Sequence, residues 1–234
     1  MADAETFVSD FHAKNQASLE RHLGAFRLAL GKETFDTVDL LRLAMKDAIE
    51  SAEVAALWFV DCDDLEMKIG LAEHCGLAAT HLRSLTARAA ALGAQPFDPR
   101  VGGYSRFFGF LRSLQTPEER AAASQVTLRT FNIGRLSASA DVCAERGDVE
   151  TERLLRDVMI ADERRIFEVG WRTLLQAASN EESQARARRS AFRIVELAAE
   201  VVEPLNLRKS LPKRRPPVPV LPPPPPPTGS LTDP

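Results

Sequence analysis

One amphipathic stretch limits the fold more than any other feature of the chain. Residues 154–175, LLRDVMIADERRIFEVGWRTLL, repeat apolar side chains at the three- and four-residue spacing of an α-helix. Glu163 lies on the apolar stripe, with Met159 and Ile166 one turn away on either side. Such a carboxylate needs a metal ion, a cationic side chain or a proton, because an unpaired buried charge is too costly. The fold must therefore supply a partner for Glu163.

Composition favours helices over sheets. The 234 residues are 44% hydrophobic and only 6% aromatic, which predicts one sizeable helical core. The net charge of -3 indicates neither a nucleic-acid partner nor a membrane partner. No apolar run reaches the roughly 20 residues that span a bilayer, and the charged first residues differ from a secretion signal. The three cysteines form no C-x-x-C pair, so we interpret them as reduced thiols of a cytoplasmic protein.

Helical periodicity recurs between clear start and stop signals. Helices are predicted over residues 5–29, 35–60, 65–92, 117–144, 149–178 and 181–202. Thr116 and Glu119 predict a capping box around Pro117, and Gly93 predicts a helix end. Asp36 or Thr37 is the expected cap of the second helix. The apolar stripe of that helix is predicted to run through Leu41, Met45, Ala48, Ile49, Ala52, Ala56 and Phe59.

The connections between these helices predict their arrangement. Residues 61–64 are a tight link, which makes the helices on either side antiparallel neighbours. Residues 94–116 form a long crossover with a Gly-Gly pair and a short aromatic helix within Tyr104–Leu114. Phe107–Phe110 is expected to pack into the core, whereas an exposed version would offer a homodimer contact. The pattern is therefore an all-α chain with a helix pair, a crossover and a second helix pair.

The composition changes after Pro204. A run rich in proline cannot form helix or sheet and favours an extended polyproline II rod. We divide the chain into an N-terminal helix at 1–34, a helical bundle at 35–178, a C-terminal helix at 179–205 and a disordered proline-rich tail at 206–234. The tail is either a spacer or a docking peptide for a protein partner.

The two helix pairs carry a family resemblance. Residues 161–174, ADERRIFEVGWRTL, resemble the fourth helix of the ferritin-like di-iron carboxylate superfamily, where D-E-x-x-H precedes a valine, a glycine and a leucine. Residues 79–96, ATHLRSLTARAAALGAQP, resemble the second helix of that family. The chain is similar to the rubrerythrin-like and tRNA-hydroxylase-like branches. The resemblance covers about 35–178 and implies a ferritin-like antiparallel four-helix bundle with additional terminal helices.

The resemblance also implies a metal site, which this chain matches only in part. The family uses a Glu from each of two helices and an E-x-x-H pair from each of the other two. Here Ile166 stands at one histidine position, Ala78 stands at one glutamate position, and residues 120–140 contain no Asp or Glu. The remaining candidate metal ligands are Glu50, Glu53, His81 and Glu163. Glu50 also has Lys46 one turn back and could form a solvated ion pair with it.

Two interpretations of Glu163 are open at this point. It could bind a metal together with Glu53 and His81, or it could be hydrogen-bonded to His81 or paired with Arg129 or Arg135. We predict a degenerate di-iron site without a cofactor, in a non-catalytic scaffold or interaction protein. The alternative is an iron-dependent oxygenase or oxidase with a reduced ligand set. His74 is interpreted as structural, and no nucleophile–base pattern or phosphate-binding loop is recognised.

Overall fold

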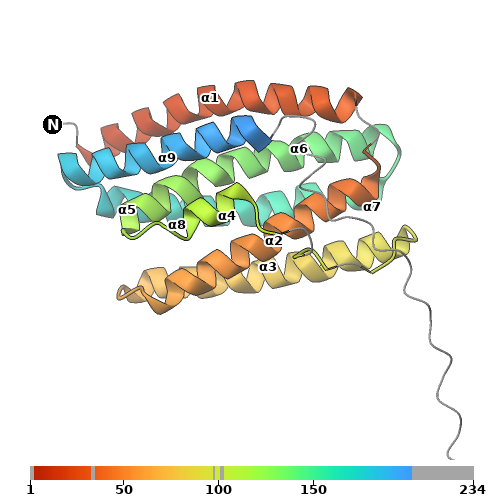
Figure 1. Cartoon of the computed structure of the whole chain (residues 1–234), viewed down its shortest axis with the longest axis horizontal. Coiled ribbons are helices and arrows are strands. Elements are labelled where there is room, and N and C mark those ends of the chain that lie inside the picture. Colours follow the sequence, from red (N-terminus) through yellow and green to blue (C-terminus); the bar gives the residue numbers. More distant parts are fainter. Residues whose placement is uncertain (1–2, 33–34, 97, 101–102, 202–234) are drawn as a thin grey trace, which may run out of the picture.

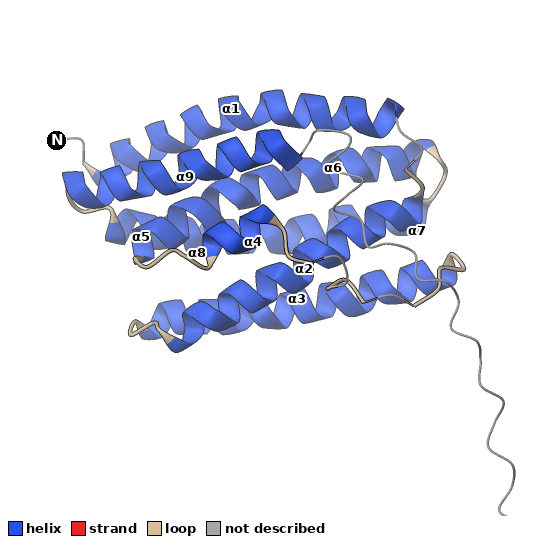
Figure 2. Ribbon diagram, in the orientation of Figure 1, coloured by secondary structure: helices blue, strands red, loops and turns tan. Residues whose placement is uncertain are grey.

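The computed structural model describes residues 3–32, 35–96, 98–100 and 103–201. The regular structure of these residues is entirely helical, with seven continuous helices and no strand (Figure 2). Five of them are α1 (Ala4–Lys32), α2 (Thr37–Val60), α3 (Leu65–Ala91), α4 (Arg106–Leu111) and α9 (Glu181–Val201). The sixth consists of α5 (Pro117–Arg120), a π-helical segment η1 (Ala121–Leu128) and α6 (Arg129–Glu145). The seventh consists of α7 (Val149–Arg153), a second π-helical segment η2 (Leu154–Ile160) and α8 (Ala161–Ala177).

The helices form layers (Figure 1). Helices α1 and α9 run side by side on one face, and α2 and α3 pack along one another on the opposite face. Between them lie the two composite helices, with η1 against both α8 and α9, and α6 against both α1 and η2. The tight link at 61–64 joins α2 to α3 as antiparallel neighbours, as the sequence predicts.

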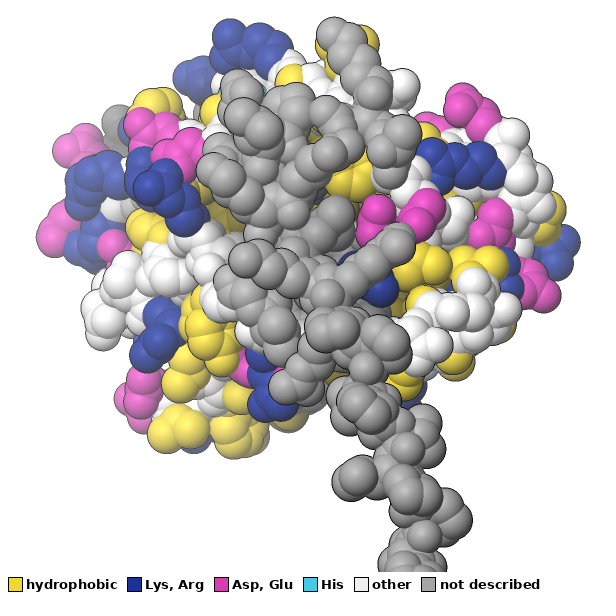
Figure 3. All heavy atoms as spheres, turned by 45° about the vertical axis from the view of Figure 1, so that its right-hand side comes forward, with side chains coloured by type: hydrophobic (Ala, Val, Ile, Leu, Met, Phe, Trp, Pro, Cys, Tyr) yellow, Lys and Arg dark blue, Asp and Glu magenta, His cyan; other side chains and the backbone are white. Residues whose placement is uncertain are grey.

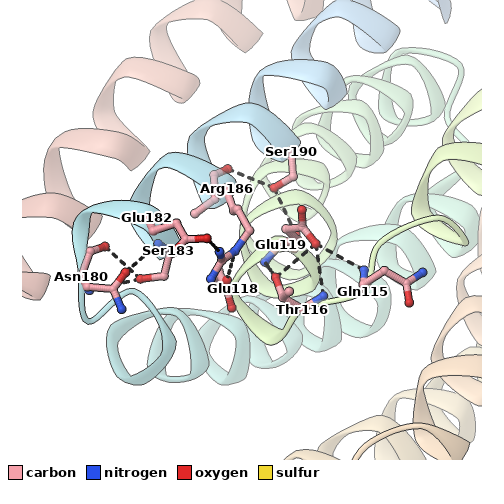
Figure 4. A network of polar contacts seen from close by, with 10 residues as sticks. Gln115, Thr116, Glu118, Glu119, Asn180, Glu182, Ser183, Arg186 and Ser190 are labelled. Carbon is pink, nitrogen blue, oxygen red and sulfur yellow. Dashed lines mark hydrogen bonds and ion pairs between the residues drawn. The ribbon is translucent and has the colours of Figure 1, made fainter.

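Polar caps fix where the helices begin. Thr116 accepts a hydrogen bond from the Glu119 amide, and the Glu119 side chain accepts one from the Thr116 amide, so the predicted capping box is confirmed. Asp36, one of the two expected caps, accepts from the Asp39 amide at 2.8 Å. Figure 4 shows that the capped start of α5 lies beside the start of α9, where Arg186 forms an ion pair with Glu118. The two helix ends are therefore held together.

The apolar interior has two parts. The larger cluster is formed by α1, α2, α3, α4, η1, α6, η2 and α9. It contains the buried Phe107 and Phe108, so the predicted core packing of that segment is confirmed. The smaller cluster lies among α1, η1, α8 and α9, and half of its buried side chains are alanines. Helix α8 approaches η1 closely at Gly170, where an added Cβ would lie 2.2 Å from the Gln125 Cβ atom. No larger residue fits there without a shift of the helix.

The predicted helices are confirmed within a few residues at their ends, but the buried face of α2 differs from the prediction. Ala56 is exposed and Phe59 is 41% exposed, whereas Ala55 and Trp58 are buried. The cause is Ser51, a polar residue that occupies an inward position. The predicted stripe avoided it and therefore continued one residue out of phase. The predicted tail at 206–234 lies outside the described residues.

Candidate functional site

Arg129, the first residue of α6, occupies the middle of the interior between α2, α3 and α8. Its side chain is only 2% exposed. The Nη1 atom donates to both carboxylate oxygens of Glu163, at 3.0 and 2.9 Å. The Nη2 atom donates to Ser51 Oγ at 2.5 Å. Of the alternatives open for Glu163, the structure contains the ion pair with Arg129.

His74 of α3 completes this group. Its Nε2 atom lies 2.6 Å from Ser51 Oγ and 3.2 Å from Arg129 Nη2. A guanidinium has donors only, so the Nε2 atom that faces it must be the acceptor and the imidazole must be neutral. Burial, together with the charges of Arg129 and His81, holds the pKa of His74 well below its ordinary value. We call Ser51, His74, Arg129 and Glu163 the buried polar layer.

His81 lies two turns further along α3 and has a partner of its own. Its Nε2 atom is 2.9 Å from Asp162 Oδ2, and both residues are buried. Asp162 also receives Arg165 Nη1 at 3.4 Å. The expected hydrogen bond between His81 and Glu163 is therefore not the one formed. Asp162, the residue before Glu163, is the partner of His81 instead.

The two candidate ligands on α2, Glu50 and Glu53, have partners other than Glu163. Glu50 pairs with Lys46 at 3.0 Å and accepts from the Ser105 amide at 2.8 Å, so the expected ion pair is confirmed, but it is buried rather than solvated. Burial raises the pKa of Glu50, while hydrogen bonds from Ser105 and the charge of Lys46 oppose the shift. Glu53 is half-buried, and its hydrogen bond with the Tyr104 hydroxyl raises the pKa of Tyr104.

The structure thus does not bring the four candidate ligands together. Glu163 contacts Arg129, His81 contacts Asp162, and Glu50 contacts Lys46. Across the described part of the chain, no group of three or more His, Cys, Asp or Glu side chains is arranged to hold a metal ion. The assignment of a metal to Glu50, Glu53, His81 and Glu163 stays a prediction.

Sequence reasoning missed three members of the site: Ser51, His74 and Asp162. One signal was available, since His74 and His81 are seven residues apart and therefore share a helical face. Ser51 and His74 also have the hydrogen-bonded geometry of a nucleophile and its base, which the sequence pattern does not reveal. However, Ser51 Oγ also accepts a hydrogen bond from Arg129 Nη2, so this oxygen is held within the buried polar layer. The cavities beside Ser51 measure about 30 and 20 Å³, room for a water molecule each.

Polar atoms that lack partners surround these small cavities. Asn132 Oδ1 and Arg129 Nε are buried without a hydrogen-bond partner among the described residues. Both residues line the two cavities. A buried polar atom without a partner is costly, so each cavity suits a bridging water better than an apolar group.

Both π-helical segments adjoin the polar layer. Arg129 directly follows η1, and Glu163 follows η2 by three residues. A π segment rotates the helix that follows it relative to a regular α-helix, and such segments are frequent at functional sites. The two charged side chains therefore owe their facing orientation partly to these wide turns.

No protein-family model, curated protein or solved structure matches the chain. Within the described ranges, no helix has both the length and the apolar character needed to cross a bilayer. Figure 3 shows one face of the molecule, where basic and acidic side chains are interspersed rather than gathered by sign.

Proposed function

We propose that this chain is a ferritin-like helical-bundle protein that has lost most di-iron ligands and acts as a non-catalytic scaffold or interaction protein. The carrying observation is the position of Arg129. Its guanidinium faces Glu163, the one acid that matches the fourth-helix ligand of the family. A guanidinium has no free electron pair for a metal and its positive charge repels one. The ion pair therefore takes over the role that a metal would have for Glu163.

The neighbouring charges support the same proposal. Three further acids each have a base: the buried Asp162 faces His81, the buried Glu50 faces Lys46, and the partly exposed Asp47 faces Arg135 at 3.0 Å. An interior with its charges paired in this way needs no additional cation for charge balance. The cavities next to Ser51 are also too small for a substrate of more than a few atoms.

Metal content tests the proposal. Full-length protein produced in iron-supplemented medium is expected to contain far less than one metal per chain. Its melting temperature is expected to be unchanged by Fe(II), Mn(II) or Zn(II). One or two metals per chain, lost in Glu163→Ala but kept in a matched surface variant, Glu168→Ala, would instead support the iron-dependent oxygenase or oxidase.

The tail supplies the partner-binding part of the proposal. Residues 206–234 contain a long proline run beside Lys213, Arg214 and Arg215, a composition that suits polyproline II recognition. Deletion of 206–234 is expected to leave the melting temperature unchanged and to abolish the capture of partners that bind the tail. Equal capture by the truncated and full-length proteins would reduce the tail to a spacer.

A further inference from the structure

A surface groove runs between helices α3 and α8, and of the buried polar layer only His74 lines it. Two adjoining cavities of about 360 and 480 Å³ lie along it and share Gly70, Glu73 and Val169 in their linings. In one cavity the N-cap Asp64 and residues 66–73 of α3 face 169–177 of α8, and in the other 70–80 face 165–169. The two helices are therefore antiparallel along the groove. From Glu66 to Thr80 it extends about 21 Å, at 1.5 Å per helical residue.

The floor of the groove is apolar at Ile166 and polar at His74 and Gln125, and its α3 wall is low. Ile166 is buried at the floor, Val169 and Leu77 are half-buried, and Ile69 is 46% exposed at the rim. Gly76 has no side chain, and a Cβ added there would meet no atom within 4 Å. An exposed apolar surface of this kind, bordered by charges, marks an interaction site.

The two walls carry opposite charges. Glu66 and Glu73 lie seven residues apart on α3, and Arg165 and Arg172 lie seven residues apart on α8, so each pair follows one helical face. Of these four, the described residues provide an ion-pair partner only for Arg165, which contacts Asp162 of its own helix at 3.4 Å. The charges do not pair across the groove, and they remain available to a ligand.

We propose that the α3–α8 groove binds an amphipathic α-helix of a partner protein. The helix has an apolar stripe, Lys or Arg along the flank that faces α3, and Asp or Glu along the flank that faces α8. A helix suits the groove better than an extended peptide, because both walls are helices without free backbone groups and a helix satisfies its own backbone. This inference rests on the proposed function, since it gives a scaffold the surface by which it binds.

The test uses the full chain and three 18-residue helical peptides with the same leucine stripe. The first has Lys along one flank and Glu along the other, the second has Lys on both, and the third has Glu on both. Only the first is expected to bind saturably at low salt, with affinity that falls as salt rises. No saturable binding up to about 1 mM, or equal binding of all three peptides, overturns the inference.

Matched variants locate the binding. Gly76→Trp fills the groove and is expected to weaken binding about tenfold or more. Gly24→Trp makes the same change on α1, where an added Cβ also meets no atom within 4 Å, and is expected to leave binding unchanged. Equal binding by both variants overturns the inference. A dimer that Gly76→Trp dissociates would assign the groove to a second copy of the chain and overturn it as well.

Charge reversal gives an independent measurement. Glu73→Lys and Arg172→Glu each reverse one of the two charges on a wall. Each is therefore expected to weaken binding several-fold. In the double variant each wall carries one acid and one base among these four positions, so neither direction of the helix matches all four charges and the two losses should add. A double variant that binds as tightly as the wild type contradicts the inference. A metal-free protein that binds none of the peptides would contradict the groove while leaving the proposed function intact.

Discussion

The two composite helices bury two different kinds of surface. Toward α1 and α9 they present small apolar side chains, and Ala121 and Ala122 of η1 meet the equally buried Ala187 and Ala191 of α9 in one cluster. Toward α2 and α3 the same helices present Arg129, which contacts Ser51 of α2 and His74 of α3. The first surface depends on volume, because alanines let helices approach closely. The second depends on charge pairing, because each buried ion needs its partner.

This difference shows where each kind of substitution is costly. A change of charge matters most on the α2–α3 side, and a change of volume matters most on the α1–α9 side. The following experiments test that division, with the largest expected effect first.

Removal of the central cation should cost most. Arg129→Met leaves the Glu163 carboxylate buried without its partner, and the free energy of unfolding is expected to fall by about 3–5 kcal/mol in urea titrations. The double variant Arg129→Met/Glu163→Leu removes both charges and should recover most of the loss. A single variant as stable as the double would show that the ion pair does not hold this side together.

An enlarged alanine should destabilise the other side. Ala187→Leu adds three carbons to a side chain that is fully buried, and overpacking is expected to cost about 1–3 kcal/mol. The control is Ala25→Leu on the exposed surface of α1, which should change stability by less than about 0.5 kcal/mol. Equal unfolding midpoints for both variants would mean that the α1–α9 side is not closely packed.

Acid should weaken the polar side through His74. Its pKa is lowered in the fold, so the unfolded chain binds the proton more readily. Stability is therefore complete above the unfolded pKa of about 6.5 and is lost as pH falls below it, by up to about 1.4 kcal/mol per pH unit.

Urea titrations at pH 7.5 and 5.5 check this expectation against His74→Gln. His12 and His22, whose pKa values burial lowers, and Glu50, whose pKa burial raises, contribute equally to both proteins. The wild type should lose more stability than the variant. Parallel losses would assign the acid sensitivity to other groups.

The cap at the start of α5 should have a smaller effect. Thr116→Ala removes the hydroxyl that accepts from the Glu119 amide, and the expected loss is about 1 kcal/mol. Thr116→Ser keeps the hydroxyl and should be nearly neutral. Thermal unfolding of the two variants distinguishes the hydrogen bond from the lost methyl group.

The helices could be predicted because their signals are local. Periodic apolar residues, Thr116 with Glu119, and short polar links are each contained in a few residues of sequence. From the sequence, the partner of Glu163 could be narrowed only to a metal ion, His81, Arg129 or Arg135. Positions 129 and 135 point to different sides of a helix, and the choice depends on the rotation introduced by η1, which periodicity does not reveal. Ser51 escaped notice because it interrupts an apolar stripe.

Gly170 has a consequence for the alignment of the two composite helices. Its backbone touches Gln125 of η1, and Glu163 on the same helix binds Arg129, four residues beyond Gln125. The steric contact and the ionic contact lie about 10 Å apart along α8. Two such contacts between the same pair of helices prevent one helix from sliding along the other or rotating against it. A methyl group at position 170 would push the two helices apart. The 2.9 Å hydrogen bond between Arg129 and Glu163 would then lengthen, although neither of these residues had changed.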